Sequence, residues 1–111
     1  MVEYRDIPGY PGYRAGSDGS IWSMWRTRPG GRFLKDWRQC KLSPGSRGYL
    51  RVNLTPLIGK AQTFRVHRLV LISFVGACPE GMEARHLNGV KDDNCIENLV
   101  WGTPEENRQD N

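Results

Sequence analysis

Alternating apolar and polar positions predict a set of short strands in the first half of the chain. Residues 21–25 follow the turn-forming sequence Ser-Asp-Gly-Ser and are expected to form one strand. Residues 49–54 alternate and predict a second strand, and the alternating segment Phe-Arg-Val at 64–66 predicts a third, paired with it across a loop. The stretch 26–46 holds two prolines and three glycines, so we expect a long exposed connection there, with no more than a short strand at 33–34.

The hydrophobic period changes to that of a helix in the middle of the chain. Four large apolar side chains fall on one face of residues 67–75, which predicts an amphipathic helix packed on the core. Beyond it, the pattern predicts a strand at 83–86, a polar loop at 87–94 and a second strand within 97–102.

A last helix is expected from Pro104 onward. Thr103 is a suitable N-cap, and Glu106 completes a capping box with it. The element order therefore predicts an α+β fold, with a small N-terminal antiparallel sheet and a helix, followed by a C-terminal strand–loop–strand–helix unit.

Basic charge is concentrated in the first half of the chain. Residues 1–60 carry eleven Lys and Arg against four acids, a net charge of +7, whereas residues 61–111 carry five against eight, a net charge of −3. The densest strip has one acid and eight basic residues, six of them Arg. Arginine suits bidentate contacts with phosphate, so we expect the strip to bind nucleic acid; the simpler alternative is a solvated basic loop. Its members are Arg26, Arg28, Arg32, Lys35, Arg38, Lys41, Arg47 and Arg51.

The cysteines and the hydropathy of the chain argue against a disulfide-rich, zinc-binding, membrane or secreted protein. Cys40, Cys78 and Cys95 are an odd number at wide spacings, which favours free thiols over a disulfide framework or a structural zinc site. No apolar run is long enough to cross a membrane, and the N-terminus lacks the apolar segment of a secretory signal. We therefore expect a single domain without a membrane partner, located in the cytoplasm.

Hydrolysis of a phosphodiester near neutral pH needs a base that deprotonates water and a cation that stabilises charge on the phosphate. A histidine, with an ordinary pKa of about 6.5, can supply the first, and a bound divalent metal ion the second. A strand–loop–strand–helix unit can bring such groups together, and His86, Asn98 and Asn107 are spaced to fit it. The other polar candidates, His67 at a strand–helix junction and the pair Asp92 and Asp93 in a turn, are expected to be structural or solvated.

These residues resemble the ββα-metal motif of HNH endonucleases, in particular those of the phage and intron-homing branch. The matching segments are residues 86–89, Asn94, 97–103 and 106–107, with 66–70 and Phe74 upstream. Residues 7–23 and 48–54 resemble the small N-terminal motif that often precedes HNH in homing enzymes. The resemblance covers nearly the whole chain.

By position, the resemblance implies a role for each of three residues. His86 would be the general base that activates water, Asn98 would hold the loop by side-chain to backbone hydrogen bonds, and Asn107 would ligate the metal. An amide oxygen is a hard ligand, which points to one Mg²⁺ or Mn²⁺ per site. The implied reaction is metal-dependent hydrolysis of DNA, by nicking or double-strand cutting, that leaves 5′-phosphate and 3′-hydroxyl ends.

Arg85 departs from the family pattern, because many homing members place an acidic metal ligand immediately before the catalytic histidine. Arginine offers only donors and cannot ligate a cation. Three explanations are open. Asn107 shares the ion with an unidentified group, phosphate oxygens and water; Arg85 itself binds a phosphate and replaces part of the metal's electrostatic role; or the site is catalytically weak. We favour the first two together.

The expected partner is double-stranded DNA. Residues 1–60 would form a basic, β-rich, DNA-contacting region, and residues 61–111 the nuclease region of the same compact unit. The alternative is a DNA-binding module that keeps the HNH scaffold without useful turnover. The oligomeric state stays open, since a monomer would nick and a homodimer would cut both strands. The resemblance further implies a bacterial or phage-infected host cell, and many homing relatives continue into a separate DNA-recognition region beyond the point where this chain stops.

Overall fold

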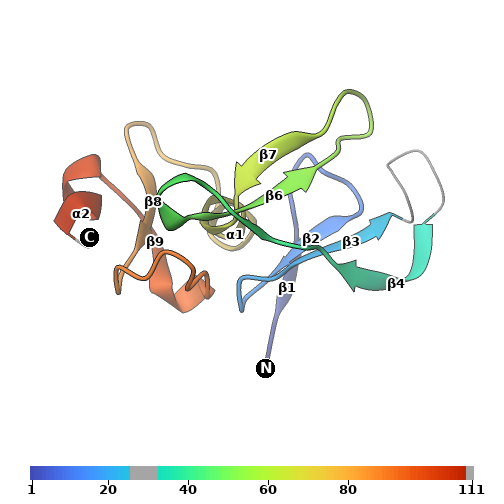
Figure 1. Cartoon of the computed structure of the whole chain (residues 1–111), viewed down its shortest axis with the longest axis horizontal. Helices are drawn as coiled ribbons and strands as arrows, with labels where there is room; N and C mark the ends of the chain where they lie inside the picture. Colours follow the sequence, from blue (N-terminus) through green and yellow to red (C-terminus); the bar gives the residue numbers. More distant parts are fainter. Residues whose placement is uncertain (26–32, 110–111) are drawn as a thin grey trace.

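A short central helix, α1 (Val66–Phe74), organises the α+β fold of the computed structural model, which describes residues 1–25 and 33–109. In Figure 1, α1 lies between a sheet built from the first strands and a C-terminal hairpin with its helix. The fold class expected from the sequence is confirmed. The remaining elements are β1 (Tyr4–Asp6), β2 (Tyr13–Gly16), β3 (Ile21–Trp25), β4 (Phe33–Gln39), β5 (Ser43–Pro44), η1 (Ser46–Gly48), β6 (Leu50–Leu54), β7 (Gln62–Arg65), β8 (Glu83–His86), η2 (Ile96–Asn98), β9 (Leu99–Gly102) and α2 (Pro104–Gln109).

The first four strands form one antiparallel sheet in the order β1-β2-β3-β4. The strand predicted at 21–25 is confirmed as β3. The long exposed connection expected between residues 26 and 46 is wrong beyond residue 32, because residues 33–39 form the seven-residue strand β4. β4 pairs with β3, with Trp22 opposite Gln39. This long-range pairing stabilises the strand although the nearby prolines and glycines favour a loop.

A second antiparallel sheet, in the order β5-β6-β7, leads directly into α1. β6 and β7 confirm the predicted pair of strands across the loop that contains Gly59, although the third strand ends at Arg65 and Val66 already belongs to the helix. Because β6 and β7 pair with each other, the expected division at residue 60 falls inside one sheet.

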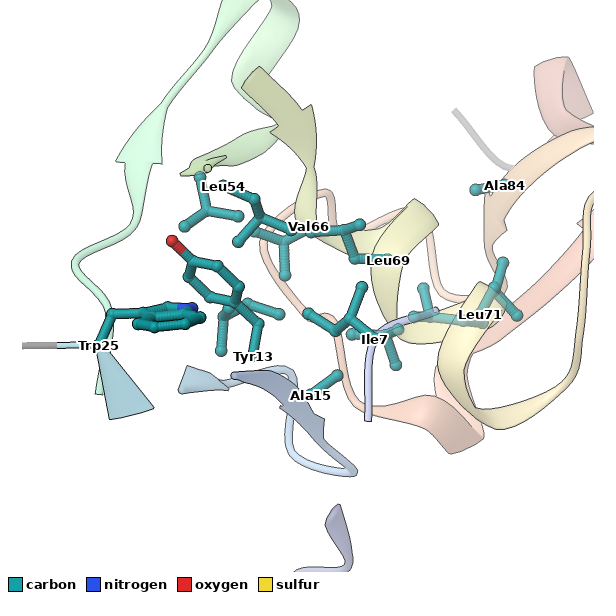
Figure 2. Close-up of a cluster of buried hydrophobic side chains, with 13 residues drawn as sticks. Ile7, Tyr13, Ala15, Trp25, Leu54, Val66, Leu69, Leu71 and Ala84 are labelled. Carbon is teal, nitrogen blue, oxygen red and sulfur yellow. The ribbon is translucent and has the colours of Figure 1, made fainter. Parts of the chain in front are cut away.

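The core joins the N-terminal strands to the C-terminal hairpin through α1. Figure 2 shows Tyr13 and Ala15 facing Val66 and Leu69 of the helix, with Ala84 of β8 beyond them. Burial of a large aliphatic side chain contributes about 1.5–3 kcal/mol, so this shared cluster fixes the hairpin relative to the two sheets.

The described residues bear on three features expected from the sequence: the state of the cysteines, membrane-spanning helices and clusters of metal ligands. Cys40, Cys78 and Cys95 are free thiols, as predicted. Within the described ranges, no helix is long and apolar enough to cross a membrane. In the same ranges, no three His, Cys, Asp or Glu side chains gather as they would around a structural zinc ion.

Candidate active site

The hairpin of β8 and β9 divides its side chains between two faces. Antiparallel pairing sets Glu83 opposite Gly102 and His86 opposite Leu99. Because side chains alternate along a strand, Ala84 and His86 lie on the buried face, and Glu83 and Arg85 lie together on the other. The end of β8 therefore presents a base on one side and charged groups on the other.

His86 is held in one orientation by a loop residue. His86 is 4% exposed, and its Nε2 lies 2.8 Å from Oδ1 of the equally buried Asn94. An amide oxygen can only accept a hydrogen bond, so Nε2 carries the proton and donates it. In the neutral ring Nδ1 then carries the lone pair, so Nδ1 is the nitrogen that can act as a general base.

Asn98 ties the ends of the intervening loop together. Its Oδ1 accepts a hydrogen bond from the backbone N–H of Asn88 at 3.1 Å, and its Nδ2 donates to the carbonyl of Asp93 at 2.9 Å. The side-chain to backbone hydrogen bonds expected of Asn98 are therefore present.

Asp93 accepts hydrogen bonds from the Asn88 side chain and the Cys95 backbone, which fits the expected Asx turn. The hydrogen bond from Asn88 lowers the pKa of the Asp93 carboxyl.

Three rings pack in nearly parallel planes beside the hairpin. The rings of His67 and His86 lie 4.7 Å apart at an interplanar angle of 6°, and Tyr49 lies 5.0 Å from His67. Burial first, then the charges of His86, Arg65 and Arg68, lower the pKa of His67 to about 3. His67 is therefore an uncharged packing partner at neutral pH, which agrees with the structural role expected for it.

α2 begins as the sequence predicts and carries Asn107 to the charged face of β8. Thr103 Oγ1 accepts from the Glu106 backbone N–H, and Glu106 Oε1 accepts from the Thr103 backbone N–H, which completes the capping box. One turn further, Asn107 Nδ2 donates to Glu83 Oε1 at 2.5 Å.

Arg85 extends over the other strand of the hairpin toward the start of α2. Its guanidinium lies 3.6 Å from Glu106 Oε2. A Cβ atom at Gly102 would approach Arg85 Cδ to 3.0 Å, so glycine provides the space that this side chain occupies. Arg85 and Glu83 thus leave β8 on the same face but contact different residues of α2.

A cavity of about 250 Å³ adjoins Asn107 and His67. Four guanidinium groups surround one carboxylate, so its wall carries a strong excess of positive charge, which suits a phosphate anion. Arg47 reaches this wall from a backbone with φ of 62°, a conformation that costs an L-residue free energy. The lining residues are Arg47, Tyr49, Arg65, His67, Arg68, Glu83, Ala84, Asn107 and Arg108.

The structure divides the predicted basic strip between two places. Arg38, Lys41 and Arg51 line a separate cavity of about 560 Å³ bordered by both N-terminal sheets, whereas Arg47 lines the smaller one. The other predicted DNA contacts, Arg26, Arg28, Arg32 and the side chain of Lys35, lie outside the described residues.

Sequence reasoning missed several residues of the site. It quoted Asn94 as part of the motif without a role, and it left Tyr49, Arg65, Arg68 and Glu83 unassigned. Arg65 and Arg68 flank His67 in the chain, and Glu83 is two residues from Arg85 in a predicted strand. Those spacings were visible, but the burial of Asn94 and the approach of α1 to β8 were not.

The comparisons with known proteins agree with this geometry. Residues 64–109 match the family model described as HNH endonuclease. DNA endonuclease I-HmuI of Bacillus phage SP01 is 36% identical over 103 residues, which are 92% of this chain and 53% of that enzyme. An uncharacterized HNH endonuclease of Acanthamoeba polyphaga mimivirus is 45% identical over 71 residues, 61% of this chain and 18% of that protein.

A solved structure gives the same result in three dimensions. It describes DNA binding and cleavage by the HNH homing endonuclease I-HmuI, and it matches this chain with a TM-score of 0.77 at 34% identity. The match covers 96% of this chain and 56% of that one, so the chain spans about half the length of I-HmuI.

Proposed function

Because residues 64–109 of this chain form an HNH endonuclease domain, we propose that the protein hydrolyses phosphodiester bonds of DNA with His86 as the general base. The observation that carries the proposal is the fixed imidazole of His86, whose Nε2 is bonded to Asn94 and whose ring stacks on His67 at the wall of an arginine-lined cavity. A base held in one tautomer next to a site for an anion is what hydrolysis of a phosphodiester requires.

In this proposal, Nδ1 of His86 takes a proton from the attacking water. The resulting imidazolium keeps its Nε2–H on Asn94 Oδ1, so no reorientation accompanies the proton transfer. Asn98 acts indirectly as a positioning residue, because its side chain holds the loop that carries Asn94. The neutral ring of His67 packs against His86 without adding a second positive charge.

The guanidinium groups of the cavity would bind the phosphates of the substrate. Arg65 and Arg68 flank His67 at the start of α1, and Arg108 approaches from α2. Arg85 leaves β8 on the same face as Glu83 but is not part of the cavity lining. It is proposed as a further phosphate contact, with its ion pair to Glu106 holding it in place.

HNH endonucleases generally use a divalent metal ion, and the donors around Asn107 fit one. An amide side chain and the carboxylate of Glu83 lie in contact at the cavity, and hard oxygen donors of this kind suit Mg²⁺ or Mn²⁺ better than zinc. A cation bound there would neutralise charge that develops on the phosphate. Asn107 is the ligand that we assign to it from the family motif.

Double-stranded DNA is the proposed substrate, cut to 5′-phosphate and 3′-hydroxyl ends. I-HmuI is described in a structure of DNA binding and cleavage. The resemblance to it covers both the N-terminal and the C-terminal half of this chain. We propose that the basic region of residues 1–60 contacts the DNA backbone, with Arg38, Lys41 and Arg51 along the larger cavity.

Nicking of supercoiled plasmid tests the proposal. In Mg²⁺ or Mn²⁺, the parent chain should convert plasmid to nicked or linear product, and His86→Ala should reduce the rate at least about 100-fold, as expected for loss of a general base. Asp92→Ala, an exposed change in the same loop, is the matched control and should cut normally. DNA binding without product in either metal ion would instead support a DNA-binding module with an inactive HNH scaffold.

A further inference from the structure

We propose that Glu83 supplies the acidic metal ligand that Arg85 cannot provide. The inference rests on the proposed nuclease function, because it identifies the second protein ligand for the ion that Asn107 would bind. It moves the carboxylate two positions along β8, from the residue before His86 to the first residue of the strand.

The geometry of β8 makes this exchange feasible. Glu83 and Arg85 project from the same face of the strand, and both reach toward α2. Arg85 contacts Glu106 at the beginning of α2, whereas Glu83 contacts Asn107. The carboxylate is therefore beside the residue that the family motif marks as a metal ligand.

The two side chains are close enough to share one ion. Neighbouring ligands around an octahedral Mg²⁺ lie about 3 Å apart, because each metal–oxygen distance is roughly 2.1 Å. Asn107 Nδ2 and Glu83 Oε1 are now 2.5 Å apart. A half-turn of the amide about its last bond would place Oδ1 where Nδ2 lies, and a cation would then replace the amide hydrogen between the two groups.

Two other nearby acids already have partners of their own. Glu106 accepts from the Thr103 backbone N–H with one oxygen and pairs with Arg85 through the other. Asp93 accepts from Asn88 and Cys95 inside the loop. Among the described residues that line the smaller cavity, Glu83 is the one acid.

The charge of the cavity indicates how the ion would be bound. One carboxylate among four arginines makes a weak site for a bare cation, because the surrounding potential is positive. The same arginines attract phosphate oxygens, which are ordinary ligands for Mg²⁺ when a protein supplies only one or two carboxylates. We therefore expect modest affinity for the ion alone.

A purely structural role for Glu83 is separable from metal binding. The contact with Asn107 also holds α2 against β8, so removing the side chain altogether would confuse the two roles. Glu83→Gln keeps an oxygen acceptor at Oε1 and removes only the charge. Glu105→Gln, an exposed acid in the first turn of α2, makes the same change in charge without facing the cavity and is the matched control.

Paramagnetic broadening by Mn²⁺ tests the proposal in the intact chain. Mn²⁺ is titrated into ¹⁵N-labelled protein, and the loss of amide signals of residues 83 and 107 is followed; this measurement is sensitive even to weak sites. The parent and Glu105→Gln should lose these signals at the same Mn²⁺ concentration. Glu83→Gln should need at least roughly 10-fold more, since loss of even an outer-shell partner has an effect of that size.

Equal broadening in Glu83→Gln and the parent, or broadening confined to other residues in the parent, would overturn the proposal. The nuclease assignment has its own readout, because plasmid nicking depends on His86. A Glu83→Gln chain that cuts plasmid as fast as the parent and binds Mn²⁺ equally would refute the role of Glu83 while leaving the proposed function intact.

Discussion

Two of the cavities formed by the described residues carry positive charge but differ in the other groups that line them. The larger one, about 560 Å³, is lined by Arg38, Lys41 and Arg51 with neutral polar side chains and the thiol of Cys40. The smaller one, about 250 Å³, combines four arginines with His67, a carboxylate and an amide, and His67 stacks on His86. The volume of a cavity therefore does not indicate which of the two is the site of hydrolysis. The smaller cavity is distinguished by an anion site, hard oxygen donors and a histidine that stacks on the proposed base, His86. We therefore assign backbone binding to the larger cavity and hydrolysis to the smaller.

Asn94→Ala should give the largest effect and should separate the chemistry of the smaller cavity from binding. Without Oδ1 of Asn94, His86 loses the acceptor that fixes its tautomer, so we expect kcat for plasmid nicking to fall about 100-fold. Affinity for DNA should change little, because Asn94 is buried, bonds to His86 and lines neither of the two arginine-bearing cavities.

The tautomer itself provides the check on this positioning role. Nitrogen-15 shifts of the imidazole should show Nε2 protonated and Nδ1 unprotonated in the parent, and a mixture of both forms in Asn94→Ala. If the variant keeps a single tautomer and cuts normally, Asn94 serves packing alone.

Removal of the three cations of the larger cavity should act on binding instead. In a variant with Arg38, Lys41 and Arg51 all changed to Ala, we expect roughly 10-fold weaker DNA binding. The slope of log affinity against log salt should decrease in magnitude by about 3, as for three lost phosphate contacts. Fluorescence anisotropy over a series of salt concentrations measures both quantities.

A matched pair of changes, Arg65→Ala with Arg68→Ala, applies the same loss of charge to the smaller cavity. It should reduce the rate of cleavage at saturating DNA, which the triple variant should leave nearly unchanged. If the triple variant instead lowers that rate with its affinity intact, the division of roles between the cavities is wrong.

The sequence predicted the smaller site better than the larger one, for a physical reason. Spacing within a hairpin and its helix is local, so His86, Asn98 and the capping box at Thr103 could be placed from the order of residues alone. The wall of the smaller cavity comes from elements distant in the chain, so the sequence did not show that Arg65 and Glu83 line the same cavity. The larger cavity depends on β4, of which the sequence indicated at most a short strand at 33–34, because long-range pairing with β3 decides its conformation.

His67→Phe should have a smaller effect, on the pH dependence of stability. The pKa of His67 is about 3 in the folded protein and about 6.5 when unfolded, so between these values the unfolded chain binds a proton that the folded chain does not. Stability contributed by neutral His67 is therefore complete above pH 6.5 and is lost as pH falls toward 3, by up to about 1.4 kcal/mol per pH unit.

Phenylalanine keeps an aromatic ring against both Tyr49 and His86 but cannot titrate. Urea unfolding at several pH values between 7 and 4 should show a shallower loss of unfolding free energy in His67→Phe than in the parent. Parallel curves for the two chains would show that His67 is protonated in the fold and is not the neutral partner of His86.

Substitution of Arg47 should have the smallest effect on DNA binding. It tests whether the strained backbone of this residue serves to place a phosphate contact at the smaller cavity. Among the described residues it is the one non-glycine with positive φ, a conformation that costs roughly 1–2 kcal/mol for a residue with a Cβ and little for glycine. Arg47→Gly should therefore leave the midpoint of thermal unfolding equal or higher, yet weaken DNA binding a few-fold through loss of one guanidinium. Arg47→Ala loses the same charge but keeps the strain, so it should bind DNA like Arg47→Gly and unfold at a lower temperature. If both variants bind DNA as the parent does, the strained backbone has no part in placing a phosphate contact, and the charge of the smaller cavity has to be attributed to Arg65, Arg68 and Arg108 alone.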